Sequence, residues 1–113
     1  MIEPTPGRIV WFRSKRETET DVLLWPPTDG QPMAAIIAHV VNRRLVHLCV
    51  IGVAGATVPR PNCILLQGDD RPPYDESYAE WMPFQRGQAK AQEQEAENLR
   101  RIDAEEQMGI FRS

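Results

Sequence analysis

Residues 33–51, with the sequence MAAIIAHVVNRRLVHLCVI, decide the fold of this chain. Two apolar runs, at 33–41 and 45–51, contain many β-branched side chains, and the short polar link 42–44 joins them. β-Branched residues pack well on a pleated surface, and a short polar link between two such runs is typical of a tight turn. The stretch therefore predicts a β-hairpin.

The length of the turn decides which side chains share a face of the hairpin, and the sequence leaves it open. A link of three residues places His39 opposite His47, whereas a link of two residues separates them. In the three-residue register, the face expected to form the core carries Ile36, Ala38, Val40, Val46, Leu48 and Val50. The second face carries Ile37, His39, Val41, Leu45, His47 and Cys49. Because this second face is also apolar, we expect the long loop, the C-terminal tail or another subunit to cover it.

Further strand signals lie on both sides of the hairpin. Residues 7–13, 63–67 and 78–84 are rich in β-formers with glycine or proline nearby. Residues 14–32 predict a long loop, in which residues 22–25 act as an apolar anchor. Four or five short strands predict a mainly β fold, either a small, strongly bent antiparallel sheet or a partly open barrel of the SH3 or OB kind. A small antiparallel sheet covered by a helix is the alternative.

The C-terminal part of the chain has the composition of a helix. Residues 88–108 consist mainly of Ala, Gln, Glu and Arg without proline or glycine, so we expect a helix that stops at Gly109. Its apolar stripe, with Leu99 and Ile102, is too thin for a buried helix. We therefore expect a β-rich domain at 1–86 and a charged helix with a short tail at 87–113.

The balance of charge argues against a nucleic-acid coat. The chain has 113 residues and a formal net charge of −3, so no overall positive field would hold duplex DNA. It begins without the basic and apolar segments of a signal peptide and has no apolar stretch of about 20 residues, which predicts a cytoplasmic protein without a membrane span. Cys49 and Cys63 lie in apolar stretches and are expected to be small buried residues.

Motifs for catalysis or for a cofactor are absent from the sequence. We find no nucleophile elbow, P-loop, dinucleotide fingerprint or zinc-protease signature. The carboxylate pairs Asp69-Asp70 and Asp75-Glu76 lie close to glycine and prolines, where a solvated loop is expected. His39, His47 and Cys49 do not have the spacing of a zinc site. We therefore expect a binding protein without catalytic residues, cofactor or metal.

Arginine, tryptophan and histidine provide the candidates for ligand binding. The planar guanidinium of arginine can donate two parallel hydrogen bonds to a phosphate, and an aromatic ring can stack on a base. The eight candidates for a small anionic, nucleotide-like ligand are Arg8, Trp11, Arg13, His39, Arg43, Arg44, His47 and Trp81. The alternative is that the tryptophans belong to the core and the arginines are solvated.

Three separated motifs, PTPGRIVWF at 4–12, QPMAAIIA at 31–38 and AEWMPFQ at 79–85, occur in this order. In these motifs the chain resembles a group of small proteins encoded by tailed bacteriophages, over about residues 4–90. The resemblance implies an accessory protein of a phage in the cytoplasm of a bacterial host. It brings no established activity and no catalytic residues.

Three functions remain open for such a protein. The first is counter-defence, in which a homo-oligomer sequesters a nucleotide-derived host immune signal in a pocket between barrels. The second is inhibition of a host enzyme by protein–protein contact, through the helix or the second face of the sheet. The third is a minor structural role in the virion.

Overall fold

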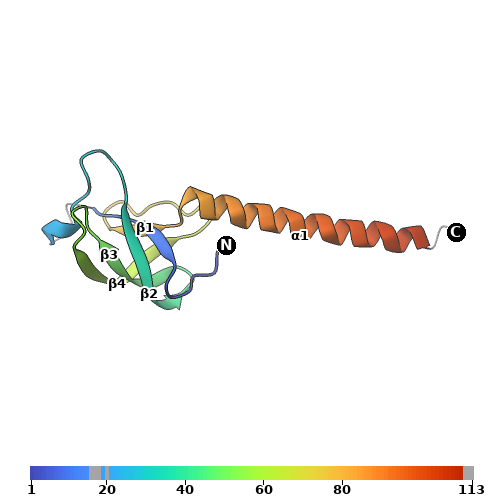
Figure 1. Cartoon of the computed structure of the whole chain (residues 1–113), viewed down its shortest axis with the longest axis horizontal. Coiled ribbons are helices and arrows are strands. Elements are labelled where there is room, and N and C mark those ends of the chain that lie inside the picture. The colour runs from blue at the N-terminus through green and yellow to red at the C-terminus, as the bar shows by residue number, and fades with distance from the viewer. Residues whose placement is uncertain (16–18, 20, 111–113) are drawn as a thin grey trace. The chain divides into compact units, whose positions relative to one another are not determined.

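The computed structural model describes residues 1–15, 19 and 21–110, with side chains as far as residue 102. This part of the chain contains five strands, one short 3₁₀ helix and one long α-helix (Figure 1). In chain order the elements are β1 (Ile9–Arg13), η1 (Val22–Leu24), β2 (Met33–Asn42), β3 (Leu45–Ile51), β4 (Thr57–Leu66), β5 (Tyr78–Glu80) and α1 (Pro83–Ile110). The last three residues of the expected tail lie outside the described part.

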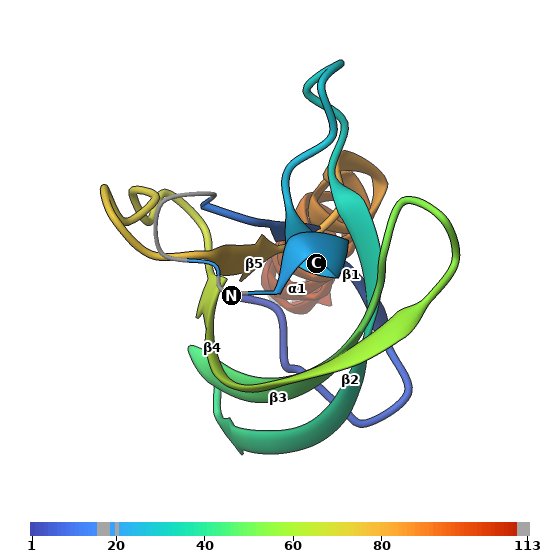
Figure 2. The ribbon, with the colours of Figure 1, turned by 90° about the vertical axis from the view of Figure 1, so that its left-hand side faces the viewer.

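The strands form a closed barrel in which each strand pairs with its neighbours in the sequence and β5 closes the ring against β1 (Figure 2). All pairs are antiparallel except β4 with β5, which is parallel. The prediction of a small β barrel with a C-terminal helix is confirmed, although the barrel is closed and one pair is parallel. The strands follow one another around the barrel in chain order, without the Greek-key crossing of an OB-fold.

The central hairpin, β2 and β3, combines the two registers that the sequence leaves open. At its tip Asn42 pairs with Leu45, so the turn has two residues. A register shift between Val40 and Asn42 then brings His39 opposite His47. The two-residue turn alone would separate the histidines. They face each other because β2 contains one extra residue, as in a β-bulge, which shifts the pairing back by one position.

The inward face of β2 differs from the predicted one. Ile37 is buried and Ile36 is exposed, whereas the predicted register places Ile36 and Ala38 in the core and Ile37 outside. A second register shift, between Ile37 and His39, explains the difference, because an extra residue reverses the alternation of side chains. On β3 the prediction is confirmed, since the buried residues are Val46, Leu48 and Val50.

β4 starts at Thr57, well before the predicted start at residue 63, although it contains two prolines. Among the described strands, the first half of β4 pairs with β3 alone, and its pairing with β5 begins where Ile64 lies opposite Tyr78. Proline has no N–H to donate, so Pro59 and Pro61 fit a strand with one free edge. The parallel pair leaves a space between the first half of β4 and the segment that precedes β5.

Inward-facing side chains from all of these strands fill the barrel. Phe12, Ile37 and Leu65 are among those fully buried. Leu24 of η1 belongs to the same cluster, and Figure 2 shows this short blue helical turn across one opening of the barrel. Trp81, which follows β5, is also a member of the cluster. The core therefore includes residues from a loop and from the segment before the helix.

The segment after β5 turns into a helix earlier than predicted. β5 ends at Glu80 and α1 begins at Pro83, so the strand expected at 78–84 is too long. Proline is favoured in the first turn of a helix because its missing N–H would have no partner there. The chain divides into two compact units after Met82, whereas the predicted boundary follows residue 86.

α1 continues past its predicted end. It includes Gly109, the expected stop, and runs to Ile110, since glycine inside a helix costs only about 1 kcal/mol. Leu99 and Ile102 are exposed, as the thin apolar stripe predicts. Within the described residues, no helix is long and apolar enough to cross a membrane.

Candidate functional site

The two arginines at the hairpin tip form ion pairs within the chain. Arg43 Nε donates to Glu3 Oε2 at 2.7 Å, and Arg44 Nε donates to Asp70 Oδ2 at 2.8 Å. The hydrogen bond from Arg44, together with one from the backbone N–H of Gln67, lowers the pKa of the Asp70 carboxyl. The arginines therefore tie the N-terminal segment and the segment after β4 to the hairpin.

Trp81 and Arg8 form a second pair. Trp81 is buried, which agrees with the alternative that this tryptophan belongs to the core, and its Nε1 donates to Gln67 Oε1 at 3.2 Å. The guanidinium of Arg8 lies 5.5 Å from the centre of the Trp81 ring. Gln67 is a buried polar residue that the sequence analysis missed, because a glutamine at the end of an apolar strand carries no pattern of its own.

Trp11 and Arg13 form a third pair on the outside of β1. Arg13 lies 5.8 Å from the centre of the Trp11 ring, and its Nε donates to Glu80 Oε1 at 3.0 Å. Its Nη1 donates to the Gly30 carbonyl at 2.8 Å. Two nitrogens of this guanidinium are thus engaged within the chain.

His39 and His47 form a fourth pair, with ring centres 5.5 Å apart and an angle of 16° between the planes. His47 Nδ1 accepts a hydrogen bond of 2.9 Å from the backbone N–H of Asn62. Within the described part of the chain, no three His, Cys, Asp or Glu side chains are grouped closely enough to hold a metal ion. The contacts above thus group the eight predicted ligand residues in four pairs.

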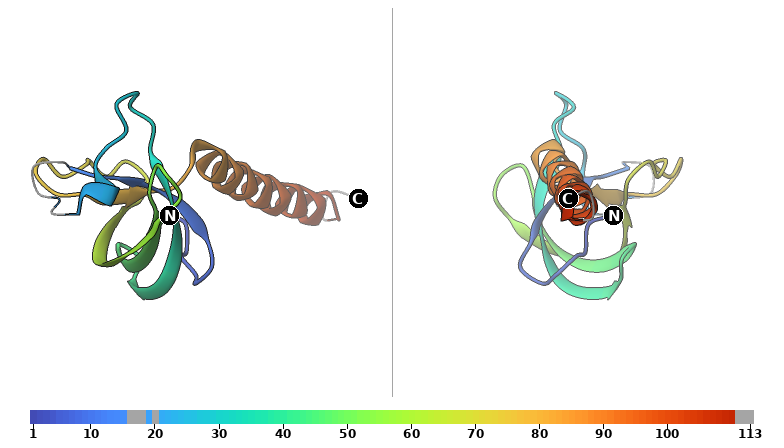
Figure 3. Two further views of the ribbon diagram at one scale, coloured as in Figure 1. Left: turned by 60° about the vertical axis from the view of Figure 1, so that its left-hand side comes forward. Right: turned by 90° about the vertical axis from the view of Figure 1, so that its right-hand side faces the viewer.

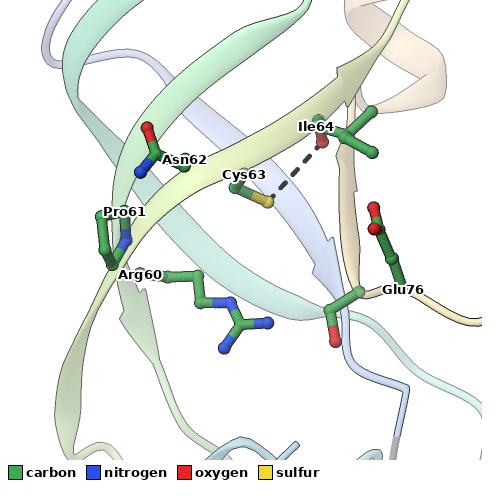
Figure 4. Close-up of a pocket in the computed structure, with 7 residues that line it drawn as sticks. Arg60, Pro61, Asn62, Cys63, Ile64 and Glu76 are labelled. Atoms are coloured by element: carbon green, nitrogen blue, oxygen red, sulfur yellow. Dashed lines mark hydrogen bonds between the residues drawn. The ribbon is translucent and has the colours of Figure 1, made fainter. Parts of the chain in front are cut away.

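A pocket of about 240 Å³ does occur where β4 and β5 diverge, and Figure 4 shows the residues that line it: Arg60, Pro61, Asn62, Cys63, Ile64, Glu76 and Ser77. The eight predicted ligand residues are not among them. The pocket is smaller than the roughly 300–1,000 Å³ typical of sites for drug-sized ligands. Arg60 Nη1 donates to Glu19 Oε1 at 3.2 Å, so its charge is compensated by a buried carboxylate.

The two cysteines should differ in reactivity. Burial raises the pKa of the Cys63 thiol to about 12, so this thiol is neutral at ordinary pH, whereas Cys49 is half-buried on the outside of β3. Because the thiolate is the reactive form, iodoacetamide at pH 8 and low protein concentration should label Cys49 well before Cys63. Mass spectrometry of the peptides over time measures both rates. Equal alkylation rates of the two thiols in the folded protein would contradict the buried position of Cys63. The control is the protein unfolded in urea, in which both thiols should be alkylated at the same rate.

The long loop between β1 and β2 exposes large apolar side chains. Val22 is 64% exposed, Leu23 46% and Trp25 39%, while Leu24 between them is 1% exposed. The sequence predicts residues 22–25 as an anchor, but only Leu24 enters the core. The turn η1 sets this orientation, because with about three residues per turn one side chain points inward while its neighbours point away.

η1 is held in a defined conformation. The Asp21 carboxylate caps it by accepting a hydrogen bond of 3.0 Å from the Leu23 N–H, and the Trp25 N–H donates to the Val22 carbonyl at 3.3 Å. Such a cap contributes about 1 kcal/mol to the stability of a helical turn. Leu24 joins this turn to the core, so the exposed side chains on either side of it are attached to the barrel.

The turn between β3 and β4 packs against η1. A Cβ atom added to Gly52 would lie 2.6 Å from the Leu23 carbonyl oxygen, so only glycine allows this approach. The next residue, Val53, is 71% exposed. We call the exposed residues Val22, Leu23, Trp25 and Val53 the loop patch. Figures 1 and 3 show η1, the short blue turn, at one end of the barrel.

We take the loop patch as the candidate site, because it brings four exposed apolar side chains together on two neighbouring segments. Apolar side chains grouped on a loop are typical of interaction sites, and tryptophan is enriched among the residues that dominate binding energy. The sequence contains one signal for it: Val22 to Trp25 is an apolar run inside an otherwise polar and proline-rich loop.

Comparison of the chain with models of protein families, with curated proteins and with solved structures finds no match. The resemblance to phage proteins therefore stays a prediction, and the function has to be argued from the surface itself.

Proposed function

We propose that this chain is a non-enzymatic protein-binding module that holds a partner protein at the loop patch. The observation that carries this proposal is the exposure of four large apolar side chains on two segments that approach each other closely at Gly52. A folded chain gains nothing from leaving such residues in water, whereas burial of a valine or leucine side chain contributes about 1.5–3 kcal/mol.

The local contacts of the loop patch support binding of a partner. Ordering a flexible loop costs free energy on association, and a surface that is already ordered avoids that cost. Here the Asp21 cap, the buried Leu24 and the contact at Gly52 fix the conformation in advance. In the phage setting that the sequence resemblance implies, the partner is a host protein, and its inhibition is the effect.

The other two functions stay predictions. Sequestration of a nucleotide-derived signal has less support, because the predicted ligand residues lie in four pairs and most of these arginines are engaged by carboxylates or by a tryptophan. A minor role in the virion rests on the resemblance alone. Detection of the protein in purified particles by mass spectrometry would give that role its first support.

The proposal predicts that polar substitutions in the loop patch abolish partner capture. We expect the double variant Leu23→Ser/Trp25→Ser to lose binding by at least about 100-fold, because loss of two central apolar contacts costs several kcal/mol. Affinity capture from host lysate, quantified by mass spectrometry, measures this loss. The matched control is Tyr74→Ser, which changes a residue that is 96% exposed on a different loop and should bind like the unmodified protein.

Both variants should fold, because the substituted side chains lie outside the core cluster, and thermal denaturation checks this. Capture of one and the same protein by all three forms would show that another surface makes the contact. Absence of any specifically captured protein would contradict the proposed function.

A further inference from the structure

The pocket between β4 and the segment before β5 is lined by polar groups that the chain itself does not use. Within the described part of the chain, the Glu76 carboxylate and the side-chain amide of Asn62 make no hydrogen bond. Ser77 Oγ accepts a hydrogen bond of 2.8 Å from the Lys15 backbone N–H, which leaves the O–H of Ser77 available to donate. Donors and acceptors are therefore available to a small molecule in this pocket.

The Arg60 guanidinium is held at the pocket by residues that are not part of its wall. Its Nη1 lies 3.2 Å from both oxygens of the Glu19 carboxylate, whose side chain is 2% exposed. Its central carbon lies 6.0 Å from the centre of the Phe12 ring. Among the described residues, Nε and Nη2 of Arg60 have no hydrogen-bond partner. These two nitrogens can bind a carboxylate through two parallel hydrogen bonds.

The charges around the pocket have both signs. Figure 4 shows Arg60 on β4 and Glu76 on the segment before β5. Burial raises the pKa of the Cys63 thiol to about 12, an effect that Arg60 opposes and that Glu19 and Glu76 increase, so these charges surround a neutral thiol. A simple anion in the pocket would be repelled by Glu76, and a simple cation would leave the free nitrogens of Arg60 unused. The arrangement favours a ligand that carries both charges.

We propose that this pocket binds a free aliphatic amino acid, whose carboxylate accepts hydrogen bonds from Arg60 and whose ammonium group donates to Glu76. Pro61 and Ile64 provide an apolar wall for the aliphatic side chain. The volume of about 240 Å³ suits a molecule smaller than the drug-sized ligands of larger pockets. This binding site goes beyond the proposed function, because none of its residues belongs to the loop patch.

The first test titrates isotope-labelled protein with L-valine and follows the backbone amide signals by NMR. We expect saturable shifts at residues 60, 62–64 and 76–77. Isovalerate is valine without its ammonium group, and isobutylamine is valine without its carboxylate. Each should bind at least about 10-fold more weakly than L-valine, because each lacks one of the two charge-assisted hydrogen bonds.

The second test changes the carboxylate that is expected to hold the ammonium group. Glu76→Gln should raise the dissociation constant of L-valine about 10-fold or more, because the amide can accept a hydrogen bond but has no charge. Glu76 is exposed, so this variant should fold. Asp75→Asn is the matched control, since it makes the same change of charge at the neighbouring residue, which is not part of the pocket wall. It should bind L-valine like the unmodified protein.

No saturation of the shifts by L-valine up to about 10 mM would overturn the proposed site. Equal binding of isovalerate or isobutylamine would overturn recognition of both charges, and equal weakening by Asp75→Asn would show that only the general charge matters. The loop-patch variant Leu23→Ser/Trp25→Ser should bind L-valine normally, and Glu76→Gln should still capture the partner protein. The two proposals therefore fail separately.

Discussion

Gln67→Leu should lower the free energy of unfolding by about 3–5 kcal/mol, since each buried polar group left without a partner costs about 1–3 kcal/mol. Gln67 is 2% exposed, and its side-chain amide makes four hydrogen bonds. Its Nε2 donates to the carbonyls of Ile2 and Arg43, and its Oε1 accepts from the Ile2 N–H and from Trp81 Nε1. Leucine has a similar size but replaces none of these bonds, and the buried indole N–H then has no acceptor.

Urea denaturation followed by tryptophan fluorescence measures this loss. The matched control is Gln31→Leu, because Gln31 is exposed and its amide donates to Asp29 nearby in the chain. We expect that control to change stability by no more than about 0.5 kcal/mol. A loss below about 1 kcal/mol in Gln67→Leu would mean that water replaces the side chain, and that Gln67 does not hold the N-terminal segment to the barrel.

Arg60→Met should cost about 2–4 kcal/mol, because it leaves the Glu19 carboxylate buried without its cation. The Glu19 side chain is 2% exposed, and Arg60 Nη1 lies 3.2 Å from it. The expected value is at or below the roughly 3–5 kcal/mol seen when a fully buried pair is broken, because Arg60 itself is 30% exposed and partly screened by water.

The double variant Glu19→Leu/Arg60→Met should regain most of that loss and come within about 1 kcal/mol of the unmodified protein, since apolar residues often replace a buried ion pair at little cost. Arg43→Met is the control, because the pair of Arg43 with Glu3 is mostly exposed and should contribute at most about 1 kcal/mol. Urea denaturation of the unmodified protein, the single variants Glu19→Leu and Arg60→Met and the double variant gives the coupling energy between Glu19 and Arg60. Additive effects of the two single substitutions would contradict a direct interaction.

Local patterns in the sequence were sufficient to predict most strands and the helix. They were not sufficient to predict how the strands close into a barrel. The alternation of β3 and the composition of α1 are properties of neighbouring residues, and both were predicted. The parallel pair of β4 with β5 depends on contacts between distant segments, and no periodicity in the chain encodes it. The inward face of β2 was predicted wrongly because one extra residue at a bulge reverses every side chain beyond it.

The candidate site could be predicted in part. The apolar run from Val22 to Trp25 indicates a special segment in the long loop, but its hydrophobicity predicts burial of the whole run. Which residue enters the core depends on the rotation of η1, which the Asp21 cap and the contact at Gly52 fix. The ion pair of Glu19 with Arg60 could not be predicted from the sequence either, because the two residues are far apart in the chain and meet only in the folded barrel.

The two prolines of β4 also bear on the solubility of the protein. An unpaired strand edge can template the addition of a strand from another molecule, which leads to aggregation. Along the first half of β4, Pro59 and Pro61 replace two N–H groups that an added strand would need, and Asn62 directs its own N–H to His47. Growth of the sheet by edge pairing is therefore hindered where the barrel is least complete.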